Sequence, residues 1–221
     1  LLWRLNDNSN VISFGVVDYF LQPGHAYYEM KRCYAPVFAS VALDDHAGIY
    51  LTNDTTRTIA GSVEVSLFHL VKNVRTRQME LPFTIEPDAT ARLCTLDEWG
   101  QIRKEQIVCV RVWDKRRTLL AETIQPLDIE RRLPYPQQVG LSMTASADTD
   151  TLLLRCEHYA RCVSLYGDGF DTLFDDNFFD LLPGETKCIR VLPSPSSGII
   201  YAETAYDQTV VSCQWKKEKE K

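Results

Sequence analysis

The sequence predicts a mainly β fold, with two β-sandwich domains in tandem that follow one strand and one helix. From residue 37 onward, apolar and polar residues alternate with a period of two in short stretches separated by turn residues. A segment with three prolines, residues 125–136, divides these stretches into two groups. Before residue 37 the spacing changes to that of a helix. These three observations together predict the fold class.

Residues 1–36 predict one β/α unit. Residues 1–5 form a short apolar strand, and residues 11–20 are rich in β-forming residues. Residues 25–34 are expected to form a helix, which starts after a Pro-Gly turn and ends before a proline. Its expected apolar stripe consists of Ala26, Tyr27 and Met30. A single β/α unit cannot fold alone, because parallel strands need further partners.

The first sandwich is expected to span residues 37–127. In residues 62–69, Val63, Val65 and Leu67 face one way and polar residues face the other, as in an antiparallel sheet with one solvated face. Short strands at this spacing over about 90 residues are typical of a β-sandwich. The strands expected in this domain are 37–43, 49–53, 62–69, 78–85, 106–114 and 119–124.

A proline-rich linker at residues 128–136 is expected to separate the two domains, because prolines stiffen a connecting segment. The second sandwich would then span residues 137–216, and a charged tail would occupy residues 217–221. The strands expected here are 139–145, 152–156, 160–165, 186–192, 199–203 and 209–215.

Composition excludes several functional classes. The 221 residues carry a net charge of −6, whereas a general nucleic-acid binder would show a basic stripe. No apolar run reaches the ~18 residues of a membrane span, so no membrane partner is expected. The seven cysteines are odd in number and form no Cys-x-x-Cys motif, which predicts buried free thiols and favours the cytoplasm.

Motifs for catalysis, cofactors and metals are missing from the sequence. It contains no Gly-x-Ser-x-Gly, His-Glu-x-x-His, phosphate loop or Gly-x-Gly-x-x-Gly. The tightest Cys/His cluster, Cys156, His158 and Cys162, has no fourth ligand at a recognisable spacing. The adjacent carboxylates of Asp44-Asp45 and Asp175-Asp176 are typical of solvated turns. We therefore expect no catalytic residue, no metal and no cofactor in this chain.

Three segments carry a resemblance to family 2 glycoside hydrolases of the β-mannosidase kind. The first runs from Trp3-Arg4-Leu5-Asn6-Asp7 to the helix and Ala35-Pro36, and resembles the end of the catalytic barrel of that family. The second, Ile49 to Asp54, is similar to a Val-x-Asn-Asp strand in the following sandwich. The third is Asp176-Asn177-Phe178-Phe179-Asp180-Leu181 with Pro183-Gly184-Glu185, which resembles a segment of the terminal immunoglobulin-like domain.

The resemblance implies that residues 1–36 are the last strand and helix of an incomplete β/α barrel, and that both sandwiches are immunoglobulin-like. It also implies a retaining mechanism with two glutamates, one of them in an Asn-Glu dipeptide. Since the chain has no Asn-Glu dipeptide, both glutamates would lie upstream of Leu1, and the chain alone should be inactive. It would act with the rest of its own polypeptide, the catalytic barrel, by buttressing that barrel and shaping access to its site.

Trp3 alone has a matching place near the sugar. The resemblance puts it at the barrel mouth of the longer polypeptide, where its ring could stack on the sugar or pack within the barrel. The family's later tryptophan is replaced by Phe14, and Asp7-Asn8-Ser9-Asn10 departs from the usual Asn-Asp-x-Trp-Pro. A β-mannoside is the expected carbohydrate substrate, with a β-glucosaminide or another β-glycoside as alternatives.

The remaining conspicuous residues have structural and functional interpretations. We expect Phe178 and Leu181 to anchor a loop in the sandwich core, with Asn177 and Asp180 bonding to local backbone. The functional alternative for this loop is that it reaches back to the barrel mouth or binds sugar. A second hypothesis is a stand-alone carbohydrate-binding or adhesive sandwich protein. It predicts that aromatic residues align on one exposed face, and the candidates for such a platform are Trp99, Trp113 and Trp215.

Overall fold

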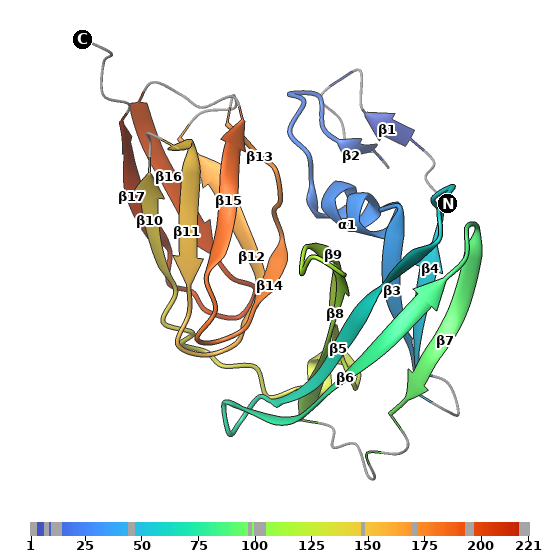
Figure 1. Ribbon diagram of the computed structural model, residues 1–221. Coiled ribbons are helices and arrows are strands. Elements are labelled where there is room, and N and C mark those ends of the chain that lie inside the picture. The colour runs from blue at the N-terminus through green and yellow to red at the C-terminus, as the bar shows by residue number, and fades with distance from the viewer. Residues whose placement is uncertain are drawn as a thin grey trace. The chain divides into compact units, whose positions relative to one another are not determined.

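The computed structural model describes residues 4–6, 9, 15–43, 47–96, 99, 105–146, 149–168, 172–192 and 197–216. The predicted fold class is confirmed: the chain is mainly β, with one α-helix in the described residues (Figure 1). It forms two compact units, which we call the middle unit, residues 32–134, and the terminal unit, residues 1–31 together with 135–221. None of the helices described is long and apolar enough to cross a membrane.

The middle unit is built from two antiparallel sheets. One has the order β3 (Val37–Ala42), β4 (Gly48–Asn53), β7 (Ala89–Thr95). The other has the order β6 (Val74–Ile85), β5 (Ile59–His69), β8 (Gln106–Asp114), β9 (Leu119–Pro126). The predicted alternation holds, because Val63, Val65 and Leu67 of β5 are buried in the core between aliphatic residues of the other strands.

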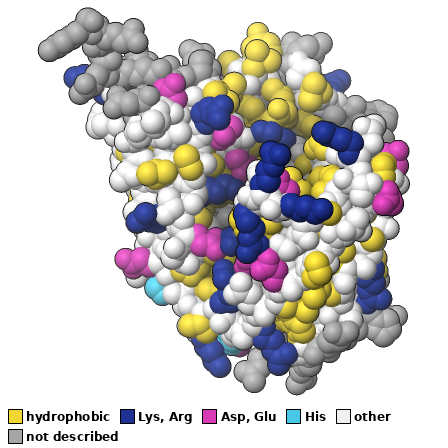
Figure 2. Space-filling view, viewed as in Figure 1, with side chains coloured by type: hydrophobic (Ala, Val, Ile, Leu, Met, Phe, Trp, Pro, Cys, Tyr) yellow, Lys and Arg dark blue, Asp and Glu magenta, His cyan; other side chains and the backbone are white. Residues whose placement is uncertain are grey.

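Two ion pairs join neighbouring strands of the sheet that contains β5. Ion pairs join Arg111 to Glu122 across β8 and β9, and Arg75 to Glu64 across β6 and β5. On the face shown in Figure 2, basic side chains lie next to acidic ones. Cross-strand pairs of opposite charge stabilise a sheet modestly and leave the buried core to decide the register.

Gly61 allows β5 and β8 to approach closely. A Cβ at Gly61 would lie 1.9 Å from the backbone oxygen of Trp113, a contact that no side-chain movement can relieve. We expect Gly61→Ala to lower the free energy of unfolding by about 3 kcal/mol, measured by urea denaturation.

Gly24→Ala is the matched control for Gly61→Ala, because a Cβ at Gly24 meets nothing closer than 3.6 Å. Its cost should stay below about 1 kcal/mol. Equal effects of the two substitutions would contradict the importance of the close approach at Gly61.

The sandwich of the terminal unit has two four-stranded antiparallel sheets. The first has the order β10 (Ser142–Ser146), β11 (Thr151–Arg155), β15 (Lys187–Leu192), β13 (Leu173–Phe174). The second has the order β14 (Phe179–Leu181), β12 (Ala160–Gly167), β16 (Ser197–Glu203), β17 (Val211–Lys216). Trp215, only 1% exposed, is the largest side chain of its core.

The β/α segment also belongs to the terminal unit. β1 (Arg4–Asn6) and β2 (Gly15–Val17) pair in parallel, and α1 (His25–Cys33) follows. Between β2 and α1, the carboxylate of Asp18 accepts a hydrogen bond from the backbone N–H of Gln22 and closes a turn. The β2 strand therefore ends before the stretch of β-forming residues 11–20 does, and residues 11–14 of that stretch lie outside the described residues.

Several expected elements differ from the structure. β7, β13 and β14 were not predicted: β7 turns only small or partly buried side chains inward, and the other two are too short to show a period. β10 starts at Ser142 rather than at residue 139, because Gly140 has a φ of +61°. β17 starts at Val211 rather than at residue 209, since the Asp207 carboxylate binds the N–H of Thr209 in a turn. A short 3₁₀-helix, η2 (Glu130–Arg132), lies within the predicted linker.

The predicted apolar stripe of the helix was wrong. Tyr28 is the buried residue of α1, whereas Ala26 is exposed and Tyr27 and Met30 are half-buried. The cysteines also depart in part from expectation. All seven are free, but Cys33 and Cys188 are exposed and the buried ones are Cys109 and Cys156.

Candidate functional site

Residues 175–180 overlap the third segment of the family resemblance and lead into β14 of the second sandwich sheet. Polar side chains hold this segment on both sides. The Asn177 side chain is 4% exposed and bonds the backbone of Leu165 on β12: its amide donates to the carbonyl, and its oxygen accepts from the N–H, at 2.9 and 2.8 Å. The same oxygen accepts the N–H of Phe178. The Asn177 side chain therefore bonds to Leu165 as a neighbouring strand would, and it joins the loop to β12.

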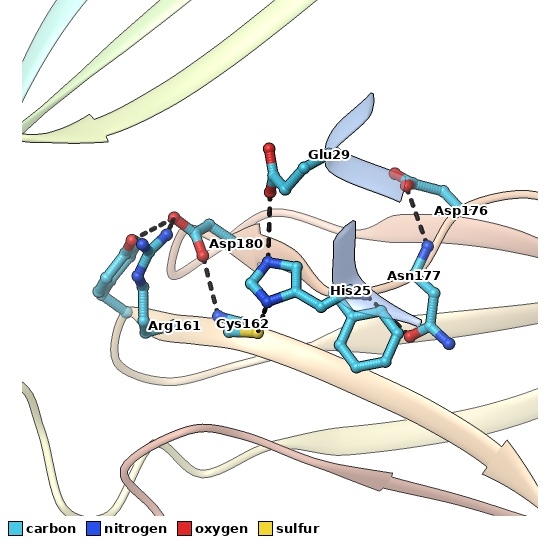
Figure 3. Close-up of polar contacts among 9 residues, drawn as sticks. His25, Glu29, Arg161, Cys162, Asp176, Asn177 and Asp180 are labelled. Atoms are coloured by element: carbon cyan, nitrogen blue, oxygen red, sulfur yellow. Dashed lines mark hydrogen bonds and ion pairs between the residues drawn. The ribbon is translucent and has the colours of Figure 1, made fainter. Parts of the chain in front are cut away.

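Asp180 occupies an irregularity in the pairing of β12 with β14. The register shifts between Ala160 and Val163, and Cys162 adopts a φ of +52°. One carboxylate oxygen of Asp180 accepts the backbone N–H of Cys162 at 2.9 Å. The other accepts hydrogen bonds from the hydroxyl of Tyr159 and from the Arg161 guanidinium, the latter at 2.7 Å. Figure 3 shows Arg161 and Cys162 converging on this carboxylate.

The electrostatics of this cluster follow from its burial. The Asp180 side chain is 6% exposed and Arg161 is 23% exposed. Burial raises the pKa of the Asp180 carboxyl, although Arg161, Tyr159 and the N–H of Cys162 all act in the opposite direction. Burial also raises the pKa of Tyr159, which therefore stays a hydroxyl donor to the carboxylate.

Helix α1 packs on the outer side of the same segment. The Tyr28 hydroxyl donates to the carbonyl of Phe174 at 3.1 Å, and the Lys31 ammonium donates to the carbonyl of Asp175. The His25 ring stacks on Phe178 with 5.3 Å between ring centroids and an interplanar angle of 19°. Burial raises the pKa of Tyr28 to about 12. These contacts bind the helix to the terminal sandwich.

The expectations for this segment hold in part. Leu181 is in the sandwich core as predicted, but Phe179 takes the place predicted for Phe178, which is half-buried and faces α1. The φ of Phe178, +53°, turns its side chain out of the core. Asn177 bonds local backbone and also β12, whereas Asp180 bonds only residues that are distant in sequence.

Other candidate residues have structural roles. Asp175 accepts the N–H of Arg190, and Asp176 pairs with Lys187 at 3.1 Å, so these adjacent carboxylates fix strands rather than form a catalytic pair. Cys156 is buried with a pKa raised to about 12 by desolvation, and its thiol donates to the carbonyl of Leu181. His158 is exposed. Among the described residues, no group of three or more His, Cys, Asp or Glu could hold a metal ion.

The tryptophan platform does not exist. Trp215 is buried in the core of the terminal unit, and Trp99 packs against the core of the middle unit. The indole nitrogen of Trp113 is itself inaccessible to solvent. Trp3, the expected sugar-stacking residue, and the tail at residues 217–221 lie outside the described residues.

Tyr159 and Arg161 were missed by the sequence reasoning. They lie two residues apart at the start of β12, so they project from one face of the strand toward Asp180. The period of two in the sequence indicates that Tyr159 and Arg161 share a face. It does not indicate that their partner is Asp180 on β14.

Comparison with known proteins finds similar sequences and a similar fold. Residues 134–204 match the family model of the Ig_mannosidase Ig-fold domain. β-Mannosidase B of Aspergillus clavatus is 23% identical over 86% of this chain and 25% of its own length, and the enzyme of Aspergillus niger matches at the same identity and coverage. The chain therefore spans about a quarter of the length of these curated relatives.

Solved structures share the fold. A β-D-mannosidase from Dictyoglomus thermophilum superposes with a TM-score of 0.75 at 20% identity, over 95% of this chain and 26% of that one. An exo-chitosanase of Amycolatopsis orientalis gives a TM-score of 0.72 at 14% identity, over 96% of this chain and 30% of that one. The chain is thus similar in sequence and fold to part of β-mannosidases, and its residues 134–204 match the model of the Ig_mannosidase Ig-fold domain.

Proposed function

We propose that the chain serves as the non-catalytic part of a retaining β-glycosidase, a β-mannosidase that hydrolyses terminal β-mannosides. The curated relatives are about four times as long, which leaves room in them for a whole catalytic barrel. A retaining glycosidase needs two carboxyl groups about 5–5.5 Å apart. The absence of an Asn-Glu dipeptide from this sequence supports a catalytic pair contributed by another part of the polypeptide.

The observation that carries this proposal is the unfinished β/α segment of the terminal unit. Within the described residues, β1 pairs with β2 alone, and its residues are all exposed. Large apolar side chains nearby are also exposed: Leu5 52%, Tyr19 49%, Phe20 44% and Leu21 65%. An open parallel edge beside exposed aromatic residues is a surface that folded proteins normally cover. The remainder of a catalytic barrel would cover it.

The proposed role of the terminal sandwich is to fix the last helix of that barrel. Tyr28, Lys31 and His25 of α1 all contact the segment that contains Asn177 and Asp180. A helix held in this way would keep its strand, and Trp3 just before it, in place at the barrel mouth. We propose domain limits at 1–36, 37–127, 128–136 and 137–216 for this arrangement, with the middle sandwich as a second support.

Turnover of an aryl β-mannoside tests the proposal. The purified 221-residue chain should release no aryl alcohol above the rate without protein, whereas the longer polypeptide should hydrolyse the substrate. Turnover by the chain alone would refute the non-catalytic role. In the longer polypeptide, Trp3→Ala should raise KM more than Trp99→Ala, because only Trp3 is proposed to contact the sugar.

A further inference from the structure

A cavity of about 430 Å³ lies in the terminal unit between the turn that leads into α1 and the end of β12. Asp18, Gln22 and Tyr28 line it on one side, and Tyr166, Asp168 and Phe174 line it on the other. This volume is in the range of pockets that bind small organic ligands, about 300–1,000 Å³. Neither the support of a barrel nor the packing of the sandwich core requires such a cavity.

The walls of the cavity are held by their own hydrogen bonds. The N–H of Asp18 donates to the carbonyl of Gln22 at 3.0 Å, and the N–H of Gln22 returns a bond to the Asp18 carboxylate at 2.8 Å. The Tyr28 hydroxyl is bound to the carbonyl of Phe174 at the base. A Cβ at Gly167 would lie 2.6 Å from the Thr172 hydroxyl, so the far wall is also closely packed. The cavity is therefore preformed, which lowers the cost of binding a ligand.

Aromatic rings give the cavity its shape. Tyr166 is 40% exposed, and its ring stacks on Tyr201 with 5.3 Å between centroids and an interplanar angle of 17°. Neighbouring stacking of this kind restricts the orientation of the Tyr166 ring. Tyr28 and Phe174 also line the cavity but are only 2% and 6% exposed, so the further exposed ring surface comes from the half-buried Phe178. A ligand with flat apolar faces would contact these rings.

The charged side chains that line the cavity limit the chemical class of ligand that it can bind. Asp18 and Asp168 are exposed carboxylates on opposite walls, and the described residues that line the cavity include no Lys or Arg. Ionised carboxylates only accept hydrogen bonds, so they suit hydroxyl and ammonium groups and repel phosphate, sulfate and carboxylate groups. Sugars combine hydroxyl donors around the ring with apolar C–H faces.

We propose that this cavity binds one or two units of a neutral or amino sugar, and that it rejects uronic acids. The Tyr166 ring contacts the apolar face of the sugar, and Asp18 and Asp168 accept hydrogen bonds from its hydroxyl or ammonium groups. The proposal does not depend on the proposed function, because binding is measured on this chain without turnover.

Ligand-observed NMR and titration calorimetry on the 221-residue chain test the site. The probes are β-1,4-mannobiose, a glucosamine disaccharide and a uronic acid disaccharide. We expect the first two to bind with Kd values on the order of 1 mM, and the third to show no binding. Tyr166→Ala should raise Kd at least about fivefold, and Asp168→Asn should weaken the glucosamine disaccharide more than mannobiose.

Matched controls are available outside the cavity. Tyr34→Ala removes a tyrosine that is 71% exposed, and Asp54→Asn changes an exposed carboxylate of the middle unit. Both should leave Kd unchanged. The site is refuted if no disaccharide binds at about 20 mM, if uronic acid binds as well as mannobiose, or if neither cavity variant changes Kd. Should Tyr166→Ala fail to fold, the nearly isosteric Asp168→Asn alone decides between these outcomes.

Discussion

Replacing Asp180 with alanine should lower the free energy of unfolding of the terminal unit by about 3–5 kcal/mol. The substitution removes the acceptor for the Tyr159 hydroxyl, for the Arg161 guanidinium and for the N–H of Cys162. It also leaves the mostly buried guanidinium of Arg161 without this carboxylate. Urea denaturation followed by far-UV circular dichroism measures the loss.

Asp180→Asn is an informative companion to Asp180→Ala. Its side-chain oxygen can still accept the N–H of Cys162, but its amide cannot accept from Arg161, so a loss of about 1–3 kcal/mol is expected. Asp54→Ala changes an exposed carboxylate and should cost no more than about 0.5 kcal/mol. If the free energies of unfolding of Asp180→Ala and Asp54→Ala agree within error, the Asp180 carboxylate does not stabilise the bulge on β12.

The pH dependence of stability in the native protein and in Asp180→Asn gives a second test of the role of Asp180. Burial raises the pKa of Asp180 in the folded state above its unfolded value of about 3.9. The folded state then binds more protons than the unfolded state, so the contribution of Asp180 to stability is complete below pH ~4 and declines as pH rises through the folded pKa. As pH rises from about 4 through the folded pKa of Asp180, the free energy of unfolding of the native protein should therefore fall relative to that of Asp180→Asn. A difference that grows with pH would contradict the raised pKa.

Local periodicity was enough to predict most of the strands but not their partners. Val63, Val65 and Leu67 are one face of β5 because a strand alternates, and this is visible in the sequence. The partners of Asp180, in contrast, lie 18 to 21 residues before it and meet it only because β12 pairs with β14 with an extra residue at Cys162. A bulge changes which side chains face each other, and the period of two carries no sign of it.

The error in the helix has a different cause. α1 has only nine residues, so its spacing of apolar residues defines a face poorly, and the stripe through Ala26 and Met30 was chosen. The structure instead buries Tyr28, and the polar ends of Tyr28 and of the exposed Lys31 reach the carbonyls of Phe174 and Asp175. Long amphipathic side chains of this kind pack with their stems and bond with their tips.

The Tyr28 contact, which was not predicted from the sequence, also has a large expected effect on stability. Tyr28→Ala removes a buried ring that is 2% exposed, together with the hydrogen bond to Phe174, and should cost about 3–5 kcal/mol. Because Tyr28 joins a short helix to a sandwich that has its own core, the loss should appear first as local opening of α1. Amide exchange at residues 27–31 should accelerate about 100-fold, which corresponds to about 3 kcal/mol.

Two variants separate this mechanism from general destabilisation. Tyr28→Phe keeps the ring and loses only the hydroxyl, so exchange in α1 should accelerate by about tenfold or less. Tyr34→Ala should leave exchange unchanged, because that side chain is 71% exposed. Amides of β11 and β15, which do not contact Tyr28, should keep their protection in all three variants. If they lose protection together with α1, the helix and the sandwich open as one unit, and the helix then depends on the whole terminal core rather than on the Tyr28 contact.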